Sequence, residues 1–167
     1  NESQVIPIFY DEITKVLTEI NSVKYEIIFV NDGSKDDTLN IIKEITKYDK
    51  NVKYISLSRN FGKESAMYAG LENSNGDYVV IMDADLQDSP DEIPALYKMI
   101  KEDGYDLVSG WKQKRYDNKL TKNLPSKLFN ATARKVTGIN LHDMNCGLKA
   151  YRLDVVKNIE VFSEMHR

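Results

Sequence analysis

The feature that most constrains this sequence is an alternation of short apolar runs with longer segments whose apolar residues repeat every three or four positions. Continuous runs, such as residues 27–30 and 78–82, are typical of strands buried on both faces. The segment over residues 6–20 instead places its apolar residues on one face of a helix. This alternation predicts an α/β fold, in which helices flank a mostly parallel sheet and ligands bind at the carboxyl ends of its strands.

The individual elements follow from periodicity and from capping signals. We expect strands over residues 24–31, 52–58, 77–82 and 105–109. We expect helices over residues 6–20, after a cap at 34–37, and over 63–73, 90–103, 124–136 and 152–159. At 167 residues, the chain has the length of one domain.

An acidic cluster follows the run at 78–82. Ser89, Pro90 and Glu92 form a capping-box pattern, and Asp88 is assigned to this helix start. Asp83 and Asp85 lie upstream of the cap and would repel each other unless a cation lay between them. They predict a site for a divalent cation, Mg²⁺ or Mn²⁺, whose coordination is completed by phosphate oxygens.

A second polar motif ends the strand predicted before residue 32. Asp32 can accept a hydrogen bond from a base or a ribose, Gly33 allows close approach of the backbone, and Ser34 lies at a helix start. The motif suits a nucleoside. It is also an ordinary turn and helix cap.

Charge is unevenly distributed along the chain. Residues 110–135 carry eight Lys or Arg and one Asp, a net charge of +7, whereas the remainder carries −10. The basic segment predicts contact with phosphate, an anionic membrane or nucleic acid, or a solvated face. Cys146 is the single cysteine, so we expect a small buried side chain and a reducing compartment.

Three motifs, at residues 30–34, 60–63 and 83–88, together resemble those of family 2 glycosyltransferases with the Rossmann-like GT-A fold. Residues 109–112 and 141–149 are similar to the polyprenyl-phosphate branch, which contains dolichol-phosphate mannose synthases and bactoprenol glucosyltransferases. The resemblance implies metal-dependent, inverting transfer of a sugar from a UDP- or GDP-linked donor to a polyprenyl phosphate. It also implies a place at the cytoplasmic face of the membrane, in the synthesis of cell-envelope glycans.

The resemblance also implies roles for individual residues. The nucleotide residues are Asp32, Gly33, Asn60, Lys63 and Asp83, and the metal residues are Asp83, Asp85 and Gln87. The acceptor-phosphate residues are Lys112, Lys122 and Ser126, and the catalytic residues are Asp143, as base or orienting group, and Asp85. His142 is a rival to Asp143. Lysine at 112 and 122 departs from the arginine common in the family, which keeps the charge but loses the bidentate fork.

Two alternatives remain open from the sequence: a family 2 enzyme acting on a polysaccharide or soluble acceptor, and a non-catalytic nucleotide-binding module. We expect a nucleotide sugar, a polyprenyl phosphate and a membrane surface as partners, and no nucleic acid. The resemblance further implies that residues 1–167 are a catalytic domain truncated at both ends. A first strand would then precede Asn1, and any membrane helices would follow Arg167.

Overall fold

The structure, a computed structural model, describes residues 1–20, 23–111 and 146–157. Its strands are β1 (Ile27–Asn31), β2 (Val52–Ser56), β3 (Tyr78–Ile81), β4 (Leu107–Ser109) and β5 (Lys149–Arg152). Its helices are α1 (Ile6–Glu19), α2 (Thr38–Tyr48), α3 (Lys63–Glu72), the 3₁₀ turn η1 (Pro90–Glu92), α4 (Ile93–Lys101) and α6 (Leu153–Val156). The helix expected over residues 124–136 lies outside the described residues.

The strands form two small sheets. β1 and β2 are parallel, with Ile27 paired to Val52 and Asn31 to Ser56. β5 lies between β3 and β4 and is antiparallel to both, so β3 and β4 run in the same direction. The expected α/β order is therefore confirmed, and β5 is a strand that the sequence did not predict.

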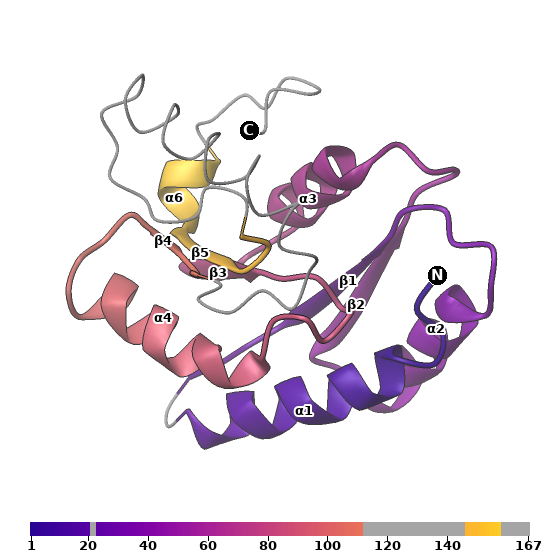
Figure 1. Ribbon diagram of the computed structural model, residues 1–167, viewed down its shortest axis with the longest axis horizontal. Coiled ribbons are helices and arrows are strands. Elements are labelled where there is room, and N and C mark those ends of the chain that lie inside the picture. Colours follow the sequence, from indigo (N-terminus) through magenta and orange to yellow (C-terminus); the bar gives the residue numbers. More distant parts are fainter. Residues whose placement is uncertain (21–22, 112–145, 158–167) are drawn as a thin grey trace, which may run out of the picture.

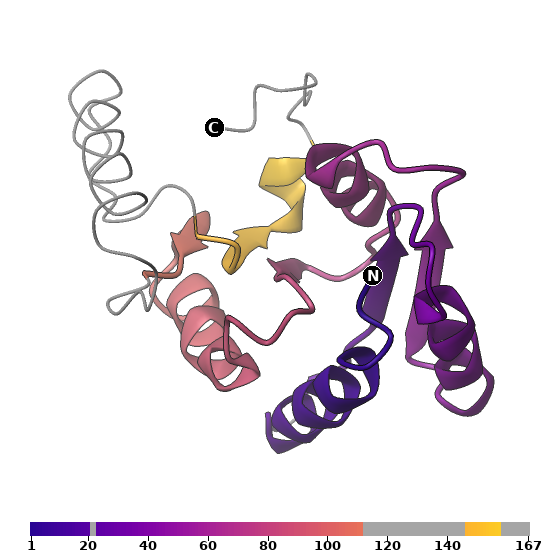
Figure 2. The ribbon, with the colours of Figure 1, turned by 45° about the vertical axis from the view of Figure 1, so that its right-hand side comes forward.

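Helices cover both faces of the strands, as Figures 1 and 2 show. α1, α2 and α4 lie on one side, whereas α3 and α6 lie on the other. The burial of alternate residues in β1 fits this layering, since Ile27, Phe29 and Asn31 are buried and the residues between them are less so. In the described part of the chain, no helix is both long and apolar enough to cross a membrane.

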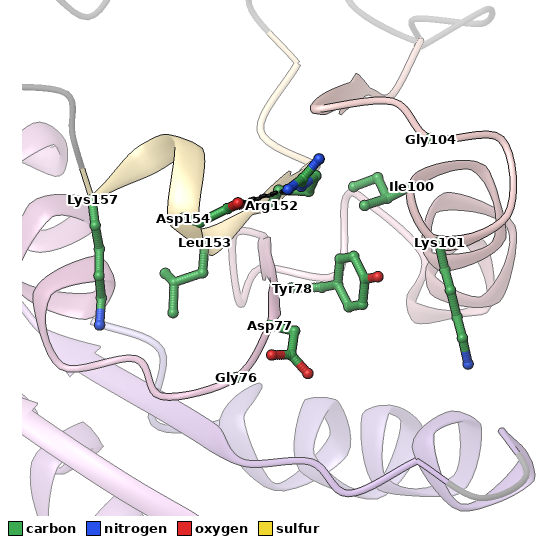
Figure 3. A pocket seen from close by; sticks show the side chains of 10 residues that line it. All are labelled: Gly76, Asp77, Tyr78, Ile100, Lys101, Gly104, Arg152, Leu153, Asp154 and Lys157. Carbon is green, nitrogen blue, oxygen red and sulfur yellow. Dashed lines mark hydrogen bonds and ion pairs between the residues drawn. The ribbon is translucent and has the colours of Figure 1, made fainter.

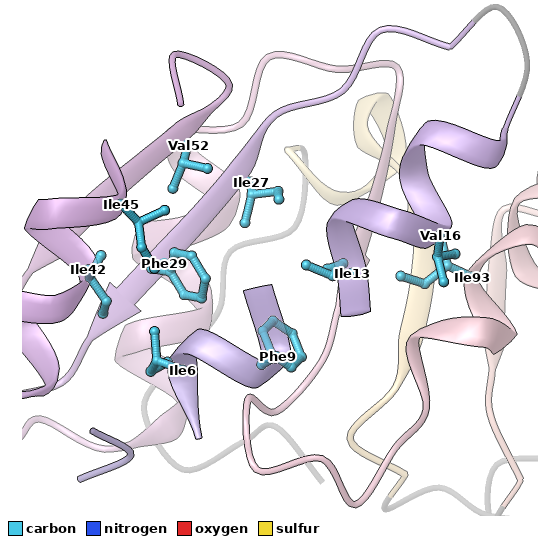
Figure 4. Packing of buried hydrophobic residues seen from close by; sticks show 10 residues of the cluster. All are labelled: Ile6, Phe9, Ile13, Val16, Ile27, Phe29, Ile42, Ile45, Val52 and Ile93. Atoms are coloured by element: carbon cyan, nitrogen blue, oxygen red, sulfur yellow. The ribbon is translucent and has the colours of Figure 1, made fainter. Parts of the chain in front are cut away.

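A core of buried side chains fixes α1 and α2 against β1 (Figure 4). The rings of Phe9 and Phe29 meet edge to face, with centroids 6.2 Å apart. A second cluster surrounds Ala150 of β5 and includes Cys146, which is buried as predicted. Val80 and Met82 pack against both clusters. Side chains at the end of β3 therefore join the two sheets, at the point where the acidic cluster begins.

The helix start at residue 90 differs from the capping-box prediction in one contact. The hydroxyl of Ser89 accepts from the N–H of Asp91 at 3.3 Å and donates to its carboxylate at 3.1 Å, rather than meeting Glu92. The first turn is a 3₁₀ turn, in which the N–H of Glu92 donates to the backbone carbonyl of Ser89 at 3.2 Å. Ser89 is the cap residue as predicted.

Candidate functional site

Asp32, at the carboxyl end of β1, binds the loop that follows β2. Its Oδ1 accepts from the N–H of Phe61 at 2.7 Å, and its Oδ2 accepts from the N–H of Gly62 at 3.0 Å. Hydrogen bonds to an ionised carboxylate are stronger than those between neutral groups. Asp32 therefore holds the backbone of this loop in place beside the end of β1.

Gly33 allows the same loop to approach β1 closely. Its φ is 68°, in the left-handed region, and a Cβ at this position would lie 2.5 Å from both the carbonyl carbon of Arg59 and the nitrogen of Asn60. The side chain of Asn60 accepts from the N–H of Gly62 at 3.1 Å. The structure thus brings together three of the residues predicted to bind a nucleotide: Asp32, Gly33 and Asn60.

Lys63, the first residue of α3, connects this loop to the acidic cluster. Its Nζ lies 2.7 Å from Oδ1 and 2.6 Å from Oδ2 of Asp83, so the ammonium group donates to both carboxylate oxygens. The two side chains are 49% and 42% exposed. The strand ends of β1 and β3 therefore belong to one site, in which Lys63 reaches from one motif to the other.

Asp85 and Gln87 form a tight turn after β3. Oδ1 of Asp85 accepts from the N–H of Gln87 at 3.0 Å, and Leu86 between them has a φ of 59°. A left-handed conformation costs a residue with a side chain about 1–2 kcal/mol. Leu86 is held in this conformation because its side chain packs against the core between α1, α2 and β1. Such backbone strain is common at functional sites.

Hard oxygen donors therefore follow one another over residues 83–87, as Mg²⁺ and Mn²⁺ prefer. Across residues 1–20, 23–111 and 146–157, no group of three His, Cys, Asp or Glu side chains is arranged to hold a metal ion by itself. A cation here would complete its coordination with oxygens from water or from a bound molecule.

Gly147 and Asp88 are site residues that the sequence did not identify. A Cβ on Gly147 would lie 2.6 Å from Oδ2 of Asp83 and 3.2 Å from Oδ2 of Asp88. Asp88 is only 6% exposed. Its assignment to the helix cap is therefore incomplete, because its carboxylate is buried against Gly147 beside Asp83. The glycine in the motif at 141–149 was a signal for this close approach.

Phe61 and Arg59 are a second pair that the sequence reasoning missed. Phe61 is 47% exposed, although its N–H is bound by Asp32, and the guanidinium of Arg59 lies 4.6 Å from the centre of its ring. The pair gives the loop a partly exposed aromatic surface and a positive charge. Both suit a flat, anionic ligand such as a nucleotide.

A cavity of about 590 Å³ lies at the opposite end of β3 (Figure 3). It includes Tyr78 at the start of that strand and Arg152 at the end of β5. The guanidinium of Arg152 lies 2.6 Å from the carboxylate of Asp154 and 3.4 Å from that of Asp106. These contacts raise the pKa of Arg152, chiefly through Asp154. The cavity is separate from the aspartates after β1 and β3, and its arginine is paired within the protein.

The remaining predicted residues are not placed by the structure. Lys112, Lys122, Ser126 and Asp143, together with the rival His142, lie outside the described residues.

Comparisons with known proteins add independent findings. The family model described as glycosyl transferase family 2 matches residues 1–160. A dodecaprenyl-phosphate galacturonate synthase of Rhizobium johnstonii is 35% identical over 174 residues, covering 99% of this chain and 52% of that protein. An undecaprenyl-phosphate 4-deoxy-4-formamido-L-arabinose transferase of Shewanella sediminis is 38% identical over 164 residues, covering 93% and 49%. The chain spans about half the length of these curated relatives.

A solved structure shows the same fold. The glucosyl-3-phosphoglycerate synthase of Mycobacterium tuberculosis, in complex with Mn²⁺, UDP-glucose and phosphoglyceric acid, superposes with a TM-score of 0.70. The two are 24% identical, and the match covers 95% of this chain and 56% of that one. The predicted GT-A fold is therefore confirmed.

Proposed function

This chain belongs to glycosyl transferase family 2, and from that premise we propose that it transfers a sugar from a nucleotide diphosphate donor to a polyprenyl phosphate, inverting the anomeric carbon. One observation carries the proposal. The loop bound by Asp32 and the carboxylate of Asp83 meet through Lys63, at the carboxyl ends of β1 and β3. Ligands of open α/β sheets bind at such strand ends.

The donor's nucleotide is assigned to Asp32, Gly33, Asn60 and Lys63, with Phe61 as an additional surface. Its diphosphate is assigned to the turn after β3, where Asp83, Asp85 and Gln87 would hold Mg²⁺ or Mn²⁺ together with phosphate oxygens. The oxygen donors fit such an ion, and the absence of a Cβ on Gly147 leaves space beside Asp83. The bound ion would neutralise the negative charge that develops on the leaving diphosphate.

The acceptor is assigned from the relatives, whose names specify dodecaprenyl phosphate and undecaprenyl phosphate. Lys112, Lys122 and Ser126 would bind its phosphate. A phosphate is already an anionic nucleophile at neutral pH, so Asp143 would orient it rather than remove a proton. Since a polyprenyl chain is a lipid, the reaction would take place at a membrane surface, and we assign it to the cytoplasmic face.

The activity can be tested with a panel of donors. The purified full-length protein is incubated with polyprenyl phosphate and, separately, with UDP- and GDP-linked sugars, with and without a chelator. We expect transfer from one donor class, loss of transfer with the chelator, and recovery when Mn²⁺ or Mg²⁺ is added in excess. Absence of transfer from every donor would overturn the proposal. Transfer to an oligosaccharide alone would favour the polysaccharide alternative.

The acceptor assignment has its own test, because the basic segment contains matched controls. Lys112→Gln, Lys122→Gln and Ser126→Ala, combined, should lower kcat/KM for polyprenyl phosphate at least about tenfold, since charge-assisted hydrogen bonds are lost. The control, Lys114→Gln with Lys119→Gln, removes the same charge from the same segment. Equal effects of the two variants would indicate a non-specific charge effect and would contradict the assignment.

A further inference from the structure

We propose that Lys63 is a positioning residue that exchanges partners. It holds the Asp83 carboxylate before a donor binds, and it moves to the donor's phosphates when Asp83 binds the metal ion. The inference rests on the proposed function and deepens it. It assigns Lys63 a second state that differs from the contact described in the structure.

The geometry of the ion pair carries the first step. The ammonium group of Lys63 lies within 2.7 Å of both oxygens of Asp83, so it occupies the side of the carboxylate that a cation would take. A divalent ion held by the same oxygens would lie close to the ammonium group. The two side chains are 49% and 42% exposed, so water weakens the repulsion between the two cations but does not remove it. The two cations therefore compete for Asp83.

The second step concerns which part of Lys63 can move. The backbone of the loop before Lys63 is bound by Asp32 through Phe61 and Gly62. The N–H of Ala66 donates to the carbonyl of Gly62 at 3.2 Å, which fixes the first turn of α3. The base of Lys63 is thus anchored, whereas its side chain is 49% exposed and has four flexible carbons. Only the tip of the side chain has to move.

The third step concerns the group to which the ammonium group of Lys63 moves. An exposed ion pair contributes little to stability, so a stronger anion can displace Asp83 as the partner of Lys63. The diphosphate of a donor is such an anion, and it would bind at the metal next to Asp83. Lys63 would then place a positive charge where negative charge develops on the leaving group, which favours the transition state.

The test measures metal binding and nucleotide binding separately, with wild type, Lys63→Gln and Lys63→Arg. Mn²⁺ binding without nucleotide is followed by electron paramagnetic resonance, and UDP and GDP binding at saturating Mn²⁺ by calorimetry. Lys63→Gln should bind Mn²⁺ about two- to fivefold more tightly, because a competing surface charge is gone. The same variant should bind UDP or GDP at least about fivefold more weakly, because a charge-assisted contact is lost. Lys63→Arg should restore nucleotide binding in part.

A tighter affinity for Mn²⁺ together with a weaker affinity for nucleotide in Lys63→Gln would indicate the exchange. Lys47→Gln is the matched control, since Lys47 forms an equally short, exposed ion pair with Glu44 on α2, and both affinities should stay at the wild-type values. If Lys63→Gln leaves both affinities unchanged, or weakens both, the exchange is wrong while the proposed function stands. If wild-type protein with Mn²⁺ binds neither UDP nor GDP, the proposed function itself fails.

Discussion

Gly147 lies opposite Asp83, and a Cβ atom on Gly147 would be 2.6 Å from the Oδ2 of that carboxylate. The pairing of β3 with β5 explains this approach. Ile81 pairs with Lys149, so continuing the same register by two residues brings Asp83 opposite Gly147. Any side chain at position 147 would have to displace the carboxylate or the strand end.

We therefore predict that Gly147→Ala weakens metal-dependent donor binding. The added methyl group would push the Asp83 carboxylate away from its present position, and because this carboxylate ends a side chain that is 42% exposed, the loss of unfolding free energy should stay below about 1 kcal/mol. UDP or GDP affinity at saturating Mn²⁺ should fall at least about tenfold, because a displaced carboxylate no longer contributes to binding the metal and its diphosphate, and the loss of one contact to a charged group costs about that much. Calorimetry measures the affinity, and urea denaturation measures the stability.

Gly104→Ala is the control for a loss of stability away from the site. Gly104 has a φ of 75°, and no atom lies within 4 Å of its Cβ position, so alanine there should cost about 1 kcal/mol of stability through strain alone. Donor affinity should remain at the wild-type value. Unchanged affinity in Gly147→Ala would contradict the assignment of Asp83 to the donor site.

The second prediction concerns Asp32→Asn. Asparagine keeps the size of the side chain but replaces one of its two acceptor oxygens by a donor. It can therefore serve only one of the N–H groups of Phe61 and Gly62. We expect a loss of about 1 kcal/mol in unfolding free energy, the usual contribution of one hydrogen bond, and a weaker affinity for nucleotide.

Comparing two nucleotides separates two roles of Asp32. Equal losses of affinity for UDP and GDP would indicate that Asp32 acts through the loop at 61–62. Unequal losses would indicate that it also contacts the base. Unchanged stability in urea denaturation would contradict the anchoring role that the hydrogen bonds indicate.

The third prediction concerns pH and Glu26, which ties β1 to its neighbours. Its carboxylate accepts from Lys53 at 2.6 Å and from the N–H of Asn75 at 2.8 Å. Burial raises the pKa of Glu26, but these hydrogen bonds together outweigh burial, and its pKa lies below the usual 4.5. A carboxylate with a lowered pKa stabilises the folded state above its unfolded pKa, and the contribution disappears as the pH falls through its folded pKa.

Glu26→Gln should therefore destabilise the protein at about pH 7, and the difference from wild type should shrink below about pH 4.5. Urea denaturation of both proteins across this range measures the difference. Glu44→Gln is the control, because Glu44 is 66% exposed in its ion pair with Lys47 and such pairs contribute little. A difference between Glu26→Gln and wild type that did not change with pH would contradict the role assigned to the charge.

Local patterns in the sequence predicted much of this fold. The buried residues of α1 recur at helical spacing, and α3 begins at Lys63 as expected. Asp32 and Asp83 follow the strands that the apolar runs at 27–30 and 78–82 predicted. These features are readable because each depends on neighbours within a few residues.

The sequence did not predict the features that depend on contacts between residues far apart in the chain. β5 has the sequence Lys-Ala-Tyr-Arg, in which Ala150 alone is buried, so no apolar run marks it as a strand. The positions of Gly147 and Asp88 beside Asp83 depend on this strand pairing with β3. The contact between Lys63 and Asp83 likewise depends on how α3 and β3 are packed, and not on any local pattern.

The last prediction separates an enzyme from a nucleotide-binding module through Asp85. Asp85→Asn keeps the oxygen that accepts from the N–H of Gln87, so the turn around Leu86 should persist and the stability should stay within about 0.5 kcal/mol of wild type. The negative charge needed by a divalent cation is lost. We therefore expect sugar transfer to fall at least about a hundredfold, whereas Asp85→Ala should also destabilise the turn. Transfer assays and urea denaturation of both variants provide the measurement. If Asp85→Asn transfers sugar as fast as the wild-type protein, Asp85 is not part of the metal site. If the wild-type protein binds UDP or GDP but transfers no sugar, it is a nucleotide-binding module and not an enzyme.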